Sequence, residues 1–150
     1  MDFNSDAAIA IKVVAGIIYK DGRVLVCQRR ADGAFPLKWE FPGGKVEKGE
    51  TDLVALDREF REELAVEVRD ARLIFRHAHS YADGPTVSLR FYHVYEFASI
   101  AKNLVFEQIS WCKLADLVDL DFLDGDRPLI EKLSVEGEAV FVRTRETRSN

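Results

Sequence analysis

Apolar and polar positions alternate along several stretches of the chain, and these stretches predict strands. β-Branched and apolar residues fill positions 9–19 and resume at 23–28, with Asp21-Gly22 between them. An Asp-Gly pair between two apolar runs is typical of a hairpin turn, so we expect these two runs to pair. The other predicted strands are 66–79 and 86–97, joined by the turn signal Ala82-Asp83-Gly84-Pro85, and a short one at 109–112.

A helical period appears at about 52–64, where four apolar side chains share one stripe at about 100° per residue. These predicted buried residues are Leu53, Leu56, Phe60 and Leu64. Shorter helices are predicted at 114–118 and 126–133, and 138–144 is a candidate further strand. Residues 31–49, rich in glycine, proline and charge, are predicted as loop apart from a short apolar piece at 39–41. The pattern predicts an α/β fold with a mixed β-sheet sandwiched between helices.

Length and composition indicate one globular domain. The chain has 150 residues, 47% of them hydrophobic and 31% charged, which suits one sizeable core and not two. We expect a single domain over 1–150, with 145–150 frayed. The apolar stretch near the N-terminus contains Lys12 and is too short to span a membrane, and no targeting segment is evident. Cys27 and Cys112 are far apart, which favours two reduced thiols and a cytoplasmic location.

The net charge of −5 argues against two classes of partner. Proteins that bind nucleic acid polymers or anionic lipid mainly through their overall field are basic, so we expect neither partner. The negative charge of a polyphosphate substrate would then have to be neutralised locally, by metal ions and a few cationic side chains at the site.

Three carboxylates gather on one side of the predicted helix at 52–64. Glu59, Glu62 and Glu63 fall in an arc of roughly 100° beside the apolar stripe, with Ala55 within it. Like charges at this spacing repel and destabilise an isolated helix. A solvated acidic face is the ordinary explanation, but the preceding Gly43-Gly44 lets backbone approach this face closely. Hard oxygen ligands at this density suit Mg²⁺, with Mn²⁺ as the alternative.

The spacing of these residues resembles a family signature. The run Gly44-x5-Glu50-x7-Arg58-Glu59-Phe60-x-Glu62-Glu63-x-Ala65-Val66 is similar to the box of the Nudix hydrolases, which cleave diphosphate linkages. One position departs, because the family has glycine where this chain has Ala65. That position follows the helix, where left-handed backbone is common, so alanine there is expected to cost about 1 kcal/mol of stability. The preceding run from Trp39 to Glu47 further resembles the MutT-like branch.

The resemblance implies roles for the box residues. Glu59, Glu62 and Glu63 would hold Mg²⁺ together with the Gly44 carbonyl. Arg58 and Glu50 would orient the helix, and Arg58, Glu50, Glu62 and Glu63 form the expected catalytic set. Water would attack a phosphorus atom while the metal neutralises charge on the attacked and leaving oxygens.

Substrate contacts are expected outside the box. Arg30 and Lys45 are candidate phosphate ligands, as are Arg29 and Lys38, and Glu40 in the MutT-like run is a further candidate substrate contact. Many relatives carry a further glutamate six residues before the equivalent of Trp111. This chain has Val105 there, with Glu107 as the nearest acid, so either Glu107 substitutes or the helix carboxylates suffice.

The resemblance places base recognition at Asp126. The residue two positions before the proline of the last helix reads the nucleobase in MutT-like enzymes, whereas Asp before a helix is also a natural cap. An ionised Asp126 accepts hydrogen bonds only, which leaves oxidised guanine and cytosine both open. Candidate stacking residues are Tyr81, Phe91, Tyr92 and Trp39. His77 and His79 share a strand face, but no third ligand is spaced to complete a metal site.

The sequence therefore favours a Mg²⁺-dependent, MutT-like enzyme that converts nucleoside triphosphates to monophosphate and pyrophosphate. Oxidised dGTP (8-oxo-dGTP) is the first expected substrate and (deoxy)CTP the second. Alternatives are a hydrolase of nucleoside diphosphate sugars or dinucleoside polyphosphates, and a non-catalytic nucleotide-binding module. A monomer and a homodimer are both compatible with the sequence.

Overall fold

The computed structural model describes residues 11–142, and its strands form two four-stranded sheets. The first sheet has the order β5-β1-β7-β6 and is mixed, because β1 runs parallel to β7 while its other pairs are antiparallel. Its strands are β1 (Ile11–Ile17), β5 (Gly43–Lys45), β6 (Glu67–Ser80) and β7 (Thr86–Ala98). In the antiparallel second sheet, β3 pairs with all three other strands. They are β2 (Tyr19–Lys20), β3 (Arg23–Gln28), β4 (Trp39–Glu40) and β8 (Gln108–Lys113).

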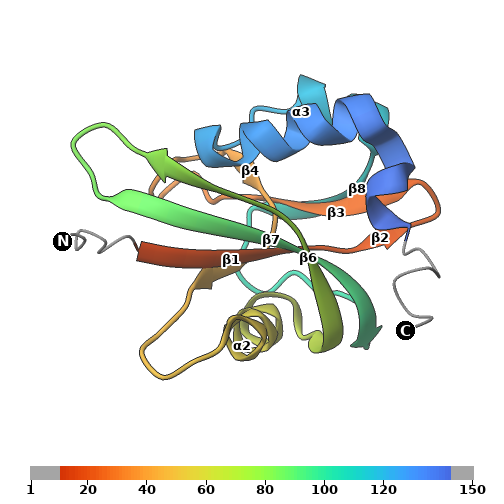
Figure 1. Cartoon of the computed structure of the whole chain (residues 1–150), viewed down its shortest axis with the longest axis horizontal. Coiled ribbons are helices and arrows are strands. Elements are labelled where there is room, and N and C mark those ends of the chain that lie inside the picture. The colour runs from red at the N-terminus through yellow and green to blue at the C-terminus, as the bar shows by residue number, and fades with distance from the viewer. Residues whose placement is uncertain (1–10, 143–150) are drawn as a thin grey trace, which may run out of the picture.

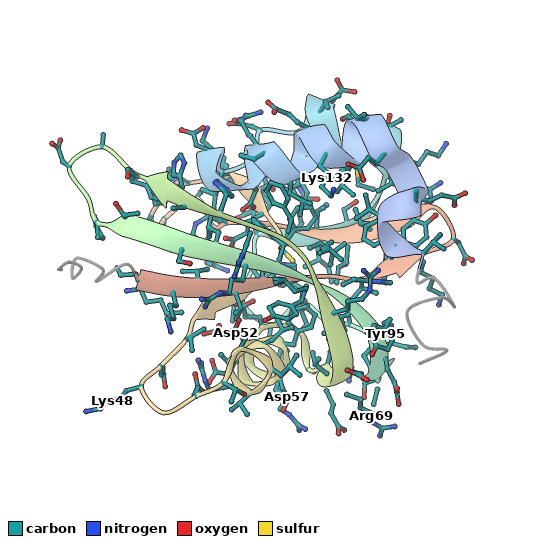
Figure 2. All side chains as sticks on the ribbon, viewed as in Figure 1. Lys48, Asp52, Asp57, Arg69, Tyr95 and Lys132 are labelled. Atoms are coloured by element: carbon teal, nitrogen blue, oxygen red, sulfur yellow. The ribbon has the colours of Figure 1, made fainter. Side chains whose placement is uncertain are left out.

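Helices lie on opposite sides of these strands (Figure 1). The helix α2 (Asp52–Leu64) covers one side, and α3 (Arg127–Glu136) covers the other. Among residues 11–142, three short 3₁₀ helices lie near α3, namely η1 (Leu114–Asp119), η2 (Asp124–Asp126) and η3 (Gly137–Phe141). In Figure 2, Asp52 and Asp57 lie on the α2 side and Lys132 on the α3 side. The predicted class, α/β with β-structure between helices, is confirmed.

The buried residues form two clusters, one on each side of the strands. Leu56, Phe60 and Leu64 of α2 belong to one cluster, and Leu129 and Leu133 of α3 belong to the other. Strand β3 contributes to both, because its side chains alternate between the two faces. This double burial explains why β3 is a continuous apolar run with no polar face.

The predicted first hairpin is wrong in one respect. The apolar run at 11–20 divides after Ile17, so that β1 joins the mixed sheet and only β2 turns back onto β3 across Asp21-Gly22. The segment 43–45, predicted as loop, is strand β5 and pairs with β1. Glycine is depleted in strands, so a glycine pair gave no strand signal.

The buried face of α2 also differs from the prediction. Leu53 is 41% exposed, whereas Ala55 is fully buried with Leu56, Phe60 and Leu64. The burial of Ala55 shows that the arc carrying the glutamates is only partly open to solvent, with Glu62 at its exposed edge. The helix contacts β5, which has backbone but little side chain to place against it.

The C-terminal part corrects a second prediction. Residues 138–141 lie in η3 and not in a strand, and Phe141 stacks on Tyr19 at 4.6 Å between ring centroids. This stacking accounts for the burial of Phe141, although its segment does not pair with a strand. The short helix at 114–118 is the 3₁₀ helix η1, and α3 continues to Glu136, three residues beyond the prediction. The parts of predicted elements at 9–10 and 143–150 lie outside the described residues.

Within residues 11–142, both cysteines are free thiols, Cys27 buried and Cys112 partly exposed. No helix in this range is long and apolar enough to cross a membrane.

Candidate active site

Both ends of α2 are fixed by local interactions that the sequence encodes. Thr51 caps the N-terminus, its side chain accepting a hydrogen bond from the Val54 N–H at 3.2 Å. At the C-terminus, Ala65 has the left-handed backbone (φ 57°) expected for the position where the Nudix box has glycine. Its N–H donates to the carbonyls of Phe60 and Arg61, which closes the last turn.

The glutamate arc of α2 lies directly against β5. A Cβ at Gly44 would collide with the carboxylate of Glu59, so a side chain there would displace this carboxylate from its present position. The N–H of Gly43 donates to Oε1 of Glu63 at 3.2 Å. Backbone of β5 and carboxylates of α2 therefore form one surface, as the glycine pair indicated.

Arg58 is the centre of an ion-pair network in this surface. Its guanidinium donates to both oxygens of Glu50, at 2.7 and 3.0 Å, and to Oε2 of Glu59 at 2.9 Å. It also donates to the Lys45 carbonyl at 3.0 Å and lies 3.5 Å from Oε1 of Glu62. These hydrogen bonds lower the pKa of Glu50 to about 2. The expected contact between Arg58 and Glu50 is therefore present, and it ties the loop before α2 to the helix.

Glu63 and Glu40 are acidic groups in a poorly solvated place. Burial raises the pKa of Glu63, and the nearby charges of Glu59 and Glu40 raise it further. Burial also raises the pKa of Glu40, against the opposing effect of Arg29, whose Nη1 lies 3.1 Å from Oε1 of Glu40. The carboxylates therefore outnumber the cations here, and ionising all of them requires another positive charge.

A hard divalent cation fits this surface by donor chemistry. Glu59, Glu62, Glu63 and the Gly44 backbone offer only oxygen ligands, which Mg²⁺ and Mn²⁺ prefer. In residues 11–142 no three His, Cys, Asp or Glu side chains already form a metal cage. Arg58 instead bonds to Glu59 and contacts Glu62, so binding a cation there requires these side chains to exchange partners.

A cavity of about 300 Å³ leads from the glutamate surface toward α3. Its lining includes Gly44, Lys45 and Glu63 from β5 and α2, and Asp126 from the segment before α3. Apolar side chains form most of its wall, from Val13, Ala15, Phe41, Val87, Leu89 and Leu123. A mostly apolar wall with a few polar groups is typical of a site for a small organic ligand.

A second cavity of about 260 Å³ adjoins the first. Both are lined by Arg29, Glu40 and Glu63, so the Arg29–Glu40 ion pair stands between them. Arg30 lines only the second cavity, where it lies 3.4 Å from Asp32 and is largely exposed. The site thus has an apolar compartment toward α3 and a charged one beside Arg29 and Arg30.

Asp126 does not act as a helix cap. It precedes α3, but its side chain makes no capping hydrogen bond and is 6% exposed. It instead accepts a hydrogen bond from the Phe41 N–H and lines the apolar compartment. Burial and the charge of Glu40 raise the pKa of Asp126 to about 8.

The other predicted contacts separate into those at the cavities and those away from them. Arg29, Arg30 and Lys45 line a cavity, whereas Lys38 pairs with Asp121 at 2.8 Å. Among the four candidate stacking residues, only Tyr81 lines the cavity. Phe91 is in the core, Tyr92 donates to Asp52 at 2.6 Å, and Trp39 is half-buried in β4.

The loop after β7 supplies apolar side chains to the site. Val105 and Phe106 line the charged compartment, and hydrogen bonds to the carbonyls of Glu63 and Leu64 hold the loop against α2. Glu107 is exposed and does not line either cavity. His77 donates to the Gly125 carbonyl at 2.7 Å from Nε2 and belongs to no three-residue metal cluster in the described part of the chain.

Several residues that line the cavities were not predicted, and Phe35 is one of them. Phe35 lines the apolar compartment and packs against Tyr81 at 5.6 Å, although it is 49% exposed and has left-handed backbone (φ 50°). An aromatic side chain in a glycine- and proline-rich loop was the available signal. Positive φ in a non-glycine residue is uncommon and concentrates at functional sites.

The model of the NUDIX domain family matches residues 10–133. This protein belongs to the Nudix family. The matched range contains α2, β5 and both cavities, so the Nudix chain has its acidic surface where the family signature lies.

Two curated relatives of this Nudix protein have names that refer to different nucleotides. A "putative 8-oxo-dGTP diphosphatase 2" of Mycobacterium tuberculosis is 37% identical over 89% of this chain and 96% of its own length. The "CTP pyrophosphohydrolase" of Escherichia coli is 35% identical over 81% of this chain and 89% of its own.

Solved structures agree with this assignment. The E. coli ORF135 protein superposes with a TM-score of 0.77 at 32% identity, over 89% of this chain and 95% of that one. A MutT Nudix hydrolase from Burkholderia pseudomallei gives 0.74 at 26% identity, over 81% and 96%. The chain is thus a MutT-like Nudix hydrolase.

Proposed function

We propose that this protein hydrolyses nucleoside triphosphates to a nucleoside monophosphate and pyrophosphate, with Mg²⁺ or Mn²⁺ as cofactor. The observation that carries the proposal is the continuity of the two compartments. An apolar cavity ending at Asp126 suits a nucleobase, and a charged cavity beside Arg29 and Arg30 suits phosphates. The acidic surface of α2 lies where they meet, since Glu63 lines both.

In this proposal Glu59, Glu62, Glu63 and the Gly44 carbonyl hold the metal. When bound, the metal neutralises charge on the phosphate oxygens as water forms the new O–P bond and the anhydride bond breaks. Arg58 and Glu50 fix α2 against β5, so that the carboxylates stay on the side of the cavity. Lys45, Arg29 and Arg30 bind phosphate oxygens, and Glu40 and Asp126 face the nucleoside.

Oxidised dGTP is our first candidate substrate, supported by the name of the Mycobacterium relative. (Deoxy)CTP is the second, supported by the name of a similarly related E. coli protein, a CTP pyrophosphohydrolase. The carboxyl group of Asp126 in the apolar compartment is compatible with either base.

The test is a panel of nucleotides incubated with the purified protein and Mg²⁺, with pyrophosphate and orthophosphate measured separately. The panel holds 8-oxo-dGTP, the common NTPs and dNTPs, 5-substituted dCTPs, a nucleoside diphosphate sugar, a dinucleoside polyphosphate and ADP-ribose. We expect pyrophosphate from a triphosphate, and chelation of the metal should abolish it. Turnover of only the diphosphate-linked compounds would contradict the substrate class. Binding without product would contradict the enzyme assignment and favour a non-catalytic module.

A further inference from the structure

The apolar compartment, in which we place the nucleobase, contains more carboxyl groups than can ionise there without a large cost in free energy. Asp126 at its end and Glu40 in its wall are carboxyl groups in a largely apolar cavity. One cation, Arg29, hydrogen-bonds to a carboxylate here, and both bonds go to Glu40, at 3.1 and 3.2 Å. Two carboxyl groups close together with one paired cation do not both ionise readily, and the unpaired one retains its proton.

The other charged groups around Asp126 do not supply its missing partner. Arg127 pairs with Asp121 and Asp124, at 3.5 and 3.7 Å. Lys45 lines the same cavity but is not among the groups that shift the pKa of Asp126, and His77 is committed to the Gly125 carbonyl. The remaining neighbours include Tyr81, whose pKa is raised by burial and by the charge of Asp126, and which brings no positive charge.

The backbone and the neighbouring side chains limit the space around Asp126. The Phe41 N–H donates to the carboxyl group, which occupies one acceptor position. The preceding Gly125 leaves no room for a side chain, since a Cβ there would lie 2.7 Å from the Tyr81 hydroxyl. Asp126 thus accepts one backbone hydrogen bond and lines the cavity together with Tyr81.

We propose that Asp126 reads the nucleobase as a neutral carboxylic acid, which donates one hydrogen bond and accepts another. This inference rests on the proposed function and deepens it. A neutral acid matches a base edge that places an acceptor beside a donor, such as N3 and the amino group of cytosine or O6 and N1–H of oxidised guanine. An ionised carboxylate matches only two adjacent donors. The raised pKa of Asp126, about 8, supports the neutral form at physiological pH.

The neutral acid makes asparagine a close mimic of Asp126, since an amide also donates and accepts. The first measurement is the binding of CMP and 8-oxo-dGMP to the metal-free protein by calorimetry at pH 7. We expect Asp126→Asn to bind the preferred monophosphate within about threefold of the unmodified protein, and Asp126→Ala to bind at least about tenfold more weakly, about 1.4 kcal/mol. If Asp126 instead recognises the base as an ionised carboxylate, both variants should bind the monophosphate more weakly.

A second measurement needs neither ligand nor turnover. The side-chain carboxyl carbons are labelled with ¹³C and titrated by NMR, and the signal missing from Asp126→Asn identifies Asp126. We expect a midpoint above pH 7. A midpoint below pH 6, or an Asp126→Asn protein that binds as weakly as Asp126→Ala, would overturn the proposal. If no triphosphate is hydrolysed but the midpoint is high, the proposed function fails while the neutral state of Asp126 stands.

Discussion

At the scale of single residues, the three box glutamates are not equivalent. The Glu62 side chain is 60% exposed, and its contact with Arg58 is long, at 3.5 Å. Glu59 is 16% exposed and bonded to Arg58, and Glu63 accepts from the Gly43 N–H. Removing a charge from Glu62 therefore disturbs the folded protein least, which makes Glu62 the cleanest position for testing metal binding.

We predict that Glu62→Gln lowers kcat/KM at least about 100-fold, or roughly 2.7 kcal/mol, because an amide is a poorer ligand for a hard cation. The unfolding temperature of the metal-free protein should stay unchanged. Steady-state kinetics and thermal unfolding measure the two effects. Glu131→Gln on the exposed face of α3 is the matched control and should keep full activity. A Glu62→Gln enzyme with unchanged kinetics would remove Glu62 from the site.

At the scale of elements, α2 carries the chemistry because several contacts fix its position. Asp52 in its first turn accepts from the Tyr92 hydroxyl at 2.6 Å, and Asp57 accepts from the Val68 N–H at 2.9 Å. These bonds join α2 to β7 and β6 independently of Arg58. The weak point is its C-terminal turn, where Ala65 is held in left-handed backbone.

We predict that Ala65→Gly raises the free energy of unfolding by about 1 kcal/mol, since glycine adopts positive φ without the Cβ clash. Ala55→Gly, the same substitution in the buried helix interior, should instead lower it by about 1 kcal/mol. Denaturant unfolding distinguishes the two signs, and Ala65→Gly should leave kcat unchanged. If both substitutions lowered stability, strain at Ala65 would not be a feature of the folded protein.

At the scale of the whole molecule, the acidic site opposes folding as the pH rises. Glu40, Glu63 and Asp126 have pKa values raised in the folded state above those of the unfolded chain. The folded state therefore holds their protons more tightly, and stability falls as pH rises from the unfolded pKa, about 4, through the folded values. A bound cation counters this loss of stability because it neutralises the negative charges of the carboxylates.

We predict that, without metal, the unfolding temperature falls between pH 5 and pH 9. Mg²⁺ should raise it, and more at pH 8 than at pH 6. At a Mg²⁺ concentration about 100 times the dissociation constant, the free energy of unfolding should rise by about 2.7 kcal/mol. This corresponds to roughly 5–10 °C in unfolding temperature for a chain of this size. Scanning calorimetry with Mg²⁺ and with EDTA measures the difference, and Glu63→Gln should reduce it. A Mg²⁺ effect that is equal at both pH values would contradict a carboxylate origin.

The sequence alone determined the features that depend on neighbouring residues. The bounds of α2, the turns at Asp21-Gly22 and 82–85, and the glutamates on one side of the helix follow from local spacing. Helical period and turn chemistry act over a few residues, so no knowledge of the rest of the chain is needed. The Nudix spacing identified the family for the same reason, because the signature is continuous in sequence.

Only the tertiary structure decided which distant residues meet. Hydrogen bonds of Trp39 with Asp121 and Leu123 join β4 to the segment before α3, and this brings Glu40 and Asp126 into one cavity. The division of the first apolar run between two sheets and the burial of Ala55 have the same origin. In each case the structure depends on pairing and burial between distant segments. The spacing of nearby residues does not encode these contacts, so it could not predict them. The proton on Asp126 is a consequence of that assembly, because it depends on which charges the fold leaves without partners.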